Sequence, residues 1–140
     1  MSFTGNFTCN TFKTGLMNGT FNFTSGSFYL ALYTNSATLD ATTTAYTATG
    51  EASGGNYVAG GNLLTIAQVP TVGNGDTAYI SFDNTSWTGA ITARGALIYL
   101  SGGGNPAVCV LDFGADKTST ATFTVQFPAV TNTSAIIRIS

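Results

Sequence analysis

The sequence contains no histidine. This absence removes the side chain that most often serves as a general base at neutral pH, as the imidazole of a catalytic triad and as a metal ligand. The sequence also lacks a GxSxG motif, a P-loop and a GxGxxG motif leading into a helix, so it predicts none of the usual hydrolase, nucleotide or dinucleotide sites. We therefore expect a protein that is not an enzyme and that uses no cofactor and no metal ion.

Charged residues are also scarce. They make up 7% of the 140 residues, whereas an average globular protein has roughly a quarter. The four cations are scattered along the chain at Lys13, Arg94, Lys117 and Arg138. A nucleic-acid-binding protein needs clustered cations to displace phosphate counterions, so no nucleic-acid partner is expected. The carboxylates fall mostly in expected turns and loops, which favours solvated groups over a Ca²⁺ site or a catalytic pair.

The two cysteines, Cys9 and Cys109, are too far apart in the sequence for metal-site spacing or a disulfide framework. We expect both to pack as small hydrophobic side chains. No apolar run approaches the ~20 residues of a membrane span. The first ten residues lack the basic and apolar segments of a signal peptide, so we expect assembly in a cytoplasm and no membrane partner.

What the sequence does contain is β-forming residues. β-branched and aromatic residues are abundant and helix formers are sparse, which predicts an all-β protein. Residues 91–114 form the clearest unit, with two apolar runs on either side of a glycine-rich turn at 101–106. This pattern predicts an antiparallel hairpin. Both runs are apolar on both faces, so we expect the hairpin to be central and covered on both sides.

Arg94 and Asp112 are the only charges inside these two apolar runs. If Leu100 pairs with Pro106, Arg94 falls directly opposite Asp112, where an ion pair can fix the strand register. We predict that these two residues form a structural ion pair that is at least half buried.

Further apolar segments flank the hairpin and are separated by turn residues such as Pro70 and the Gly–Asn–Gly–Asp cluster at 73–76. Together they give about seven strands in a single domain, 1–140. This number and spacing predict an antiparallel two-sheet sandwich, immunoglobulin-like or jelly-roll-like. The additional strands are expected at 27–33, 57–65, 77–82, 121–127 and 135–139.

Residues 1–27 are rich in phenylalanine. Within them, residues 10–17 have the spacing of a short helix, with Asn10 as its N-cap and a stop at Asn18 and Gly19. Two interpretations are open: a helix that closes one end of the sandwich, or an arm that docks on a partner. In the second, the candidate interface residues are Phe3, Phe7, Phe12, Phe21 and Phe23.

Residues 34–56 lack the apolar alternation of their neighbours and are dominated by Thr, Ala, Ser and Gly. We predict an extended peripheral loop that contributes little to the core, with Tyr46 as its one anchor.

Several segments resemble a family of small virion proteins of tailed bacteriophages. The most specific are SATLDATTTAY at 36–46, TARGALIYL at 92–100 and VLDFGADK at 110–117, and the resemblance extends over most of the chain. It implies a β-sandwich building block of the phage particle, a capsid decoration (cement) protein that stabilises the head shell. The family has no catalytic residues to carry over, and it implies a location in the virion. The chain departs from the family pattern at 101–106, where SGGGNP replaces a plain Asn- or Ser-containing turn.

The resemblance also implies partners, namely the major capsid protein and further copies of the chain. A trimer is favoured by analogy, because decoration proteins commonly occupy three-fold lattice points. The small number of charges and the five N-terminal phenylalanines agree with surfaces covered by neighbours. The alternative is a tail or tail-fibre domain that binds glycans, with Trp87, Tyr29, Tyr33 or Tyr46 as the stacking surfaces.

Overall fold

Ten β-strands and one α-helix make up the part of the chain that this computed structural model describes, residues 3–73 and 75–139. All the strand pairs are antiparallel, which confirms the predicted sandwich-like all-β architecture with a short N-terminal helix. In chain order the elements are β1 (Phe7–Thr8), α1 (Asn10–Asn18), β2 (Phe28–Tyr33), β3 (Asn62–Leu63), β4 (Ile66–Val72), β5 (Ala78–Phe82), β6 (Thr85–Thr88), β7 (Ile91–Leu100), β8 (Ala107–Ser119), β9 (Thr122–Val125) and β10 (Ile137–Ile139).

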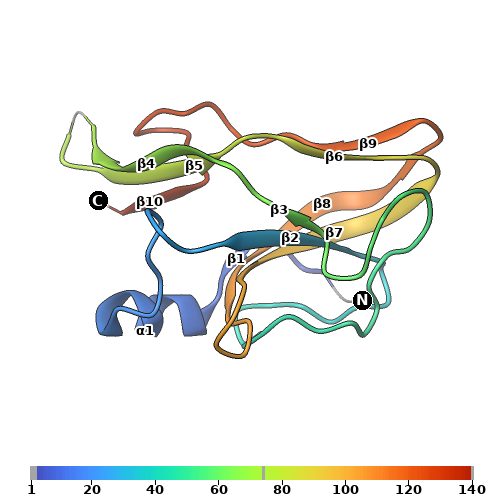
Figure 1. Ribbon diagram of the computed structural model, residues 1–140, viewed down its shortest axis with the longest axis horizontal. Helices are drawn as coiled ribbons and strands as arrows, with labels where there is room; N and C mark the ends of the chain where they lie inside the picture. The colour runs from blue at the N-terminus through green and yellow to red at the C-terminus, as the bar shows by residue number, and fades with distance from the viewer. Residues whose placement is uncertain (1–2, 74, 140) are drawn as a thin grey trace.

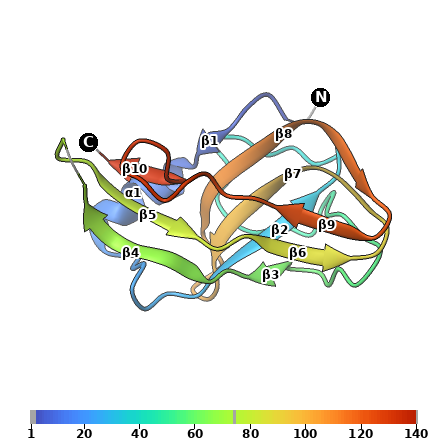
Figure 2. The same cartoon turned by 90° about the horizontal axis from the view of Figure 1, so that it is seen from above.

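The strands form two layers (Figure 1). One layer is a five-stranded sheet in the order β1-β8-β7-β2-β3. The other layer combines a three-stranded sheet, β10-β5-β4, with a two-stranded sheet, β6-β9. Along one side the chain passes directly from β3 in the first layer to β4 in the second. Along the opposite side the outer strands are β1 and β8 in the first layer and β9 and β10 in the second (Figure 2).

Strand β7 lies between β8 and β2 and is the most completely buried long strand of the sandwich. Of its ten residues only Thr92 is exposed, and Arg94 and Leu100 are partly covered. The β7–β8 hairpin is therefore central, as its apolar faces predict.

The register of this hairpin differs from the prediction. Gly95 pairs with Asp112 and Ala93 pairs with Lys117, so residues 113–116 of β8 bulge out opposite the single residue Arg94. Gly114, within the bulge, has a φ of +83°, a conformation that glycine adopts at little cost. The constant register assumed from the sequence is wrong because bulge residues shift the pairing without changing the apolar pattern.

Three strands are missing from the sequence prediction, the two-residue β1 and the longer β4 and β6. β4 runs through Pro70, which is tolerated because β4 is an edge strand whose pairing with β5 is irregular between Gln68 and Thr71. β6 forms within 83–89, where the sequence suggests only a polar turn, because it pairs with β9. Asn74, which the sequence places in the turn at 73–76, lies outside the described residues.

Helix α1 begins at Asn10, and its N-cap is Cys9 rather than Asn10. It ends as predicted at Gly19, which has a left-handed φ of +83° and donates its backbone N–H to the Gly15 carbonyl. Phe12 is buried beneath the helix, whereas Leu16 and Met17 remain exposed.

The interpretation in which the N-terminal phenylalanines form a surface that docks on a partner is wrong. Phe3, Phe12, Phe21 and Phe23 are buried within the chain's own core, and Phe7 is partly buried. The Phe12 ring lies 5.0 Å from that of Phe21 and 5.8 Å from that of Phe23. The chain reverses after α1 and returns two phenylalanines beneath the helix, so the rings fill the end of the sandwich together.

The segment 34–56 is also more tightly integrated than expected. Its side chains Ala37, Leu39 and Ala52 are buried in the core. Ala45 forms a β-bridge with Pro106, and Glu51 forms one with Tyr33 at the end of β2. Small apolar residues separated by threonine give no alternating pattern, which explains why the sequence does not reveal this contribution.

Gly95 provides a test of the packing of the N-terminal segment. A Cβ atom at this position would lie 2.4 Å from the Phe3 ring and 2.5 Å from the Leu111 carbonyl oxygen. We predict that Gly95→Ala lowers the free energy of unfolding by about 1–3 kcal/mol, because it overpacks a buried site. Urea unfolding measures this effect. Thr92→Ser, at the exposed position of the same strand, keeps the hydroxyl that hydrogen-bonds to Thr118 Oγ1, so it is the control and should change stability by less than about 0.5 kcal/mol. Equal stability of Gly95→Ala and wild type would contradict this packing.

Candidate functional site

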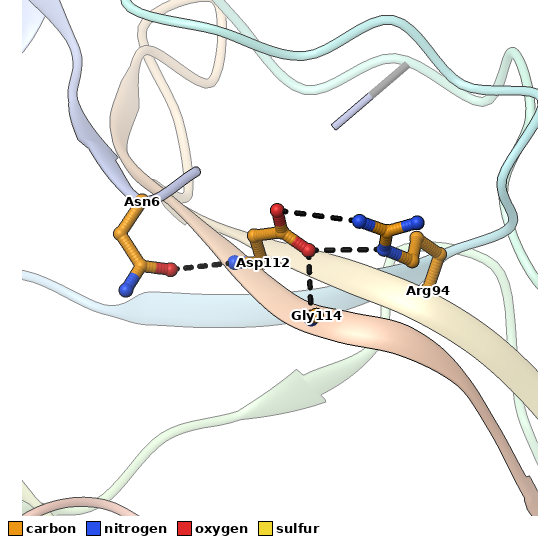
Figure 3. Close-up of polar contacts among 4 residues, drawn as sticks. All are labelled: Asn6, Arg94, Asp112 and Gly114. Carbon is orange, nitrogen blue, oxygen red and sulfur yellow. Dashed lines mark hydrogen bonds and ion pairs between the residues drawn. The ribbon is translucent and has the colours of Figure 1, made fainter. Parts of the chain in front are cut away.

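Arg94 and Asp112 form the only ion pair among the residues that the structure describes. Arg94 Nε lies 3.0 Å from Asp112 Oδ1, and Nη2 donates to Oδ2 at 3.5 Å (Figure 3). Their side chains are only 12% and 11% exposed. The structure thus brings the two residues together and covers them, although Gly95, rather than Arg94, is the direct partner of Asp112.

Asp112 organises the backbone around it. Its carboxylate accepts the Gly114 N–H at 2.8 Å, and its own N–H donates to Asn6 Oδ1 at 2.6 Å. The hydrogen bond from Arg94 and the Gly114 N–H hold the pKa of the Asp112 carboxyl below its usual range, against the opposing effect of burial. The pair therefore closes the bulge at 113–116 and ties the N-terminal segment to β8, which is a structural role.

A second polar cluster surrounds Glu51. Its Oε1 accepts the Tyr46 hydroxyl at 2.7 Å, and its Oε2 accepts the Tyr57 hydroxyl at 2.5 Å and the Gly60 N–H at 2.8 Å. Tyr57 in turn accepts the Leu32 N–H at 2.9 Å. The carboxylate therefore ties residues 46–60 to strand β2.

The tyrosines of this cluster are held in their protonated form. Burial raises the pKa of Tyr99 to about 12, and the nearby Glu51 carboxylate adds to the effect. Burial and the hydrogen bonds to Glu51 also raise the pKa values of Tyr46 and Tyr57, and burial raises that of Tyr33. At neutral pH these hydroxyls act as hydrogen-bond donors and not as bases or nucleophiles.

Sequence reasoning missed Glu51 because its two tyrosine partners lie in irregular segments on either side of it. No spacing rule relates Tyr46 or Tyr57 to a carboxylate. The one available signal was a single acid within a segment otherwise free of charge after Asp40.

The two cysteines are both free and both buried. Burial raises the pKa of the Cys9 thiol to about 11 and that of Cys109 to about 12. Since the thiolate is the reactive form, neither residue is suited to nucleophilic chemistry at neutral pH.

The clearest concave feature is a cleft of about 520 Å³. Its lining residues come from β10, α1, β1, β8 and the segments that precede β5 and β10. A neighbouring groove of about 360 Å³ lies between α1 and the three-stranded sheet. The cleft is lined by Thr8, Phe12, Lys13, Leu16, Thr77, Val108, Cys109, Asn132, Ile136, Ile137, Arg138 and Ile139.

Two of the four aromatic residues considered for glycan stacking are unavailable. Trp87 is 2% exposed and Tyr33 is 0% exposed, so neither ring can receive a sugar. Tyr29 and Tyr46 are partly exposed, but both rings contact Tyr99. The Trp87 Nε1–H is buried without an acceptor in the described structure.

Residues 3–73 and 75–139 contain no group of three or more Cys, Asp or Glu side chains placed to hold a metal ion. In the same residues, no helix has the length and apolar character required to cross a membrane.

Comparisons with known proteins give no relatives. No family model matches the chain, and neither a curated protein nor a solved structure is significantly similar to it.

The Asp112 carboxylate makes the free energy of unfolding depend on pH in the acidic range. Its pKa is lowered in the folded state, so its contribution is present above the ordinary aspartate pKa of about 4 and is lost as the pH falls through the folded value. We predict that Asp112→Asn costs about 1–2 kcal/mol at pH 7 and flattens the loss of stability between pH 5 and pH 2. Thermal unfolding across this range measures both effects. Parallel curves for the variant and wild type would contradict the role assigned to the pair.

Glu51 gives a separate test of the loop. Glu51→Gln presents an amide N–H₂ to one of the hydroxyls or to the Gly60 N–H, so at least one buried donor loses its acceptor. We predict a loss of about 1–2 kcal/mol in urea unfolding and faster proteolysis within 34–56. Asp83→Asn, at an exposed turn carboxylate, is the control and should change stability by less than about 0.5 kcal/mol. Unchanged proteolysis in Glu51→Gln would show that the carboxylate does not hold the loop.

Proposed function

We propose that this protein is a structural component of a tailed-bacteriophage particle, a decoration (cement) protein that binds the major capsid protein and stabilises the head shell. It acts by binding and carries out no chemical reaction. The observation that carries the proposal is a surface with few charges and with apolar side chains gathered at one end of the β-sandwich.

The distribution of exposed apolar side chains supports a protein-binding role. Five of the eight large hydrophobic residues that remain exposed lie on α1, β4 and β10, which share one end of the molecule (Figure 1). They are Leu16, Met17, Val69, Val72 and Ile139. An exposed apolar patch of this kind marks a surface that another protein covers.

The segments that resemble phage virion proteins belong to one connected part of the fold. Residues 92–100 lie in β7, residues 110–117 lie in β8, and the segment 36–46 reaches the turn of this hairpin through the Ala45–Pro106 bridge. The three segments that resemble the phage proteins are therefore neighbours in the fold, which supports the proposal.

We also propose that the protein acts as a homo-oligomer, with a trimer favoured by analogy to three-fold sites of capsid lattices. The burial of Phe3, Phe12, Phe21 and Phe23 removes these residues as a reason for assembly. The proposed oligomer therefore rests on that analogy, and the exposed apolar residues at the α1–β10 end are assigned to the contact with the capsid.

The glycan-binding alternative has less support. Burial of Trp87 and Tyr33 leaves it with Tyr29 and Tyr46, whose rings are engaged with Tyr99. No observed aromatic surface favours a sugar, so a tail-fibre role is not proposed as a second function.

The proposal is tested on particles of the phage that encodes the chain. Purified particles should contain the protein in copy numbers comparable to those of the capsid lattice points. Purified protein added to shells that lack it should sediment with them and raise their disruption temperature. A few copies per particle would point instead to the tail, and absence from particles would refute a virion role.

A further inference from the structure

The cleft between β10, α1 and the β1–β8 edge combines an apolar floor, an unpaired strand edge and two cations without acidic partners. We propose that it binds an extended segment of a neighbouring virion protein, in which apolar residues flank an acidic residue. The segment adds as a further strand beside β10. This inference rests on the proposed function and specifies the chemistry of its partner.

The apolar floor comes from both the helix and the sheets. Phe12 and Leu16 of α1, Val108 of β8, and Ile137 and Ile139 of β10 all line the cleft. Leu16 is 37% exposed and Ile139 is 54% exposed, so these two residues can be contacted by apolar side chains from outside, whereas Phe12 and Val108 are buried behind them. Burying a large aliphatic side chain there would favour binding against the cost of ordering the segment.

The edge of β10 specifies an extended backbone. β10 is an outer strand that pairs only with β5, and four consecutive residues, 136–139, line the cleft. Its outer edge therefore offers backbone N–H and C=O groups to an added strand. β-augmentation uses such an edge for affinity and uses adjacent pockets to select alternate side chains.

The charges specify an acidic residue in that segment. Lys13 and Arg138, two of the chain's four cations, line the cleft, and no carboxylate does. Neither cation forms an ion pair with a described residue, although one guanidinium N–H of Arg138 donates to the Thr133 carbonyl. The acid closest in sequence to any residue that lines the cleft is Asp76, which is exposed and precedes the lining residue Thr77. Charge complementarity therefore favours a carboxylate at this edge.

A second copy of the chain does not supply such a segment. In the described structure its carboxylates lie in bends or turns, in the short connection between β5 and β6 or in the β8 bulge, or are engaged in the Arg94 and Glu51 clusters. None lies on an unpaired extended stretch with apolar residues on both sides. The partner is accordingly a different protein.

Charge reversal tests the recognition. Arg138→Glu and Lys117→Glu change the net charge equally, but Lys117 lies on β8 outside this cleft. We expect Arg138→Glu to weaken co-sedimentation with shells lacking the protein by at least tenfold, Lys13→Glu/Arg138→Glu to weaken it further, and Lys117→Glu to stay within about twofold. These positions are exposed, and unchanged melting temperatures verify folding.

Two results would separate failure of this inference from failure of the proposed function. If wild type and the double variant bind shells equally, the cleft is not the site, while the decoration role stands. If wild type never sediments with shells, both fall.

A photo-crosslinking residue at Leu16, which lines the cleft, identifies the occupant directly. On shells, it should crosslink to a peptide of another virion protein that carries Asp or Glu among apolar residues. Crosslinks to a second copy of this chain, or to a peptide without an acidic residue, would overturn the assignment.

Discussion

Burial of strand β7 on both faces is the constraint on which the rest of the structure depends. Its two edges pair with β8 and β2, and one of its faces packs against the second layer. The other face is covered by Phe3, which lies against Gly95, and by Tyr46, whose ring contacts that of Tyr99. Fully burying a side chain such as Leu97 contributes about 1.5–3 kcal/mol. The remaining large aromatic residues of the N-terminal segment fill the end of the same core, so they lie inside the chain.

With so few charges, the chain fixes its irregular segments through hydrogen-bond donors gathered around two carboxylates. Asp112 closes the β8 bulge with Arg94 and Gly114, and Glu51 anchors the long loop with Tyr46 and Tyr57. In each case the carboxylate accepts several hydrogen bonds at once, which offsets the cost of partial burial. Both acids therefore stabilise the architecture.

The surface of the protein is uneven. Threonine, serine and asparagine hydrate most of it, whereas apolar side chains collect around α1, β4 and β10. The cleft at this end also carries two cations, so it couples hydrophobic burial with a preference for negative charge. Hydrophobic contact would supply affinity to such a site, and charge would supply orientation and selectivity.

The sequence by itself determined the β class, the central hairpin, the end of the helix at Gly19 and the association of Arg94 with Asp112, because apolar alternation and turn residues act locally. Tertiary structure decided the bulge at 113–116, the strand through Pro70, the burial of the phenylalanines and the Glu51 cluster. Each of these depends on which distant segment supplies a hydrogen-bond partner or covers a ring. Tertiary structure also decided the α1–β10 cleft. Its lining residues come from both ends and from the middle of the sequence, and they come together only in the folded chain.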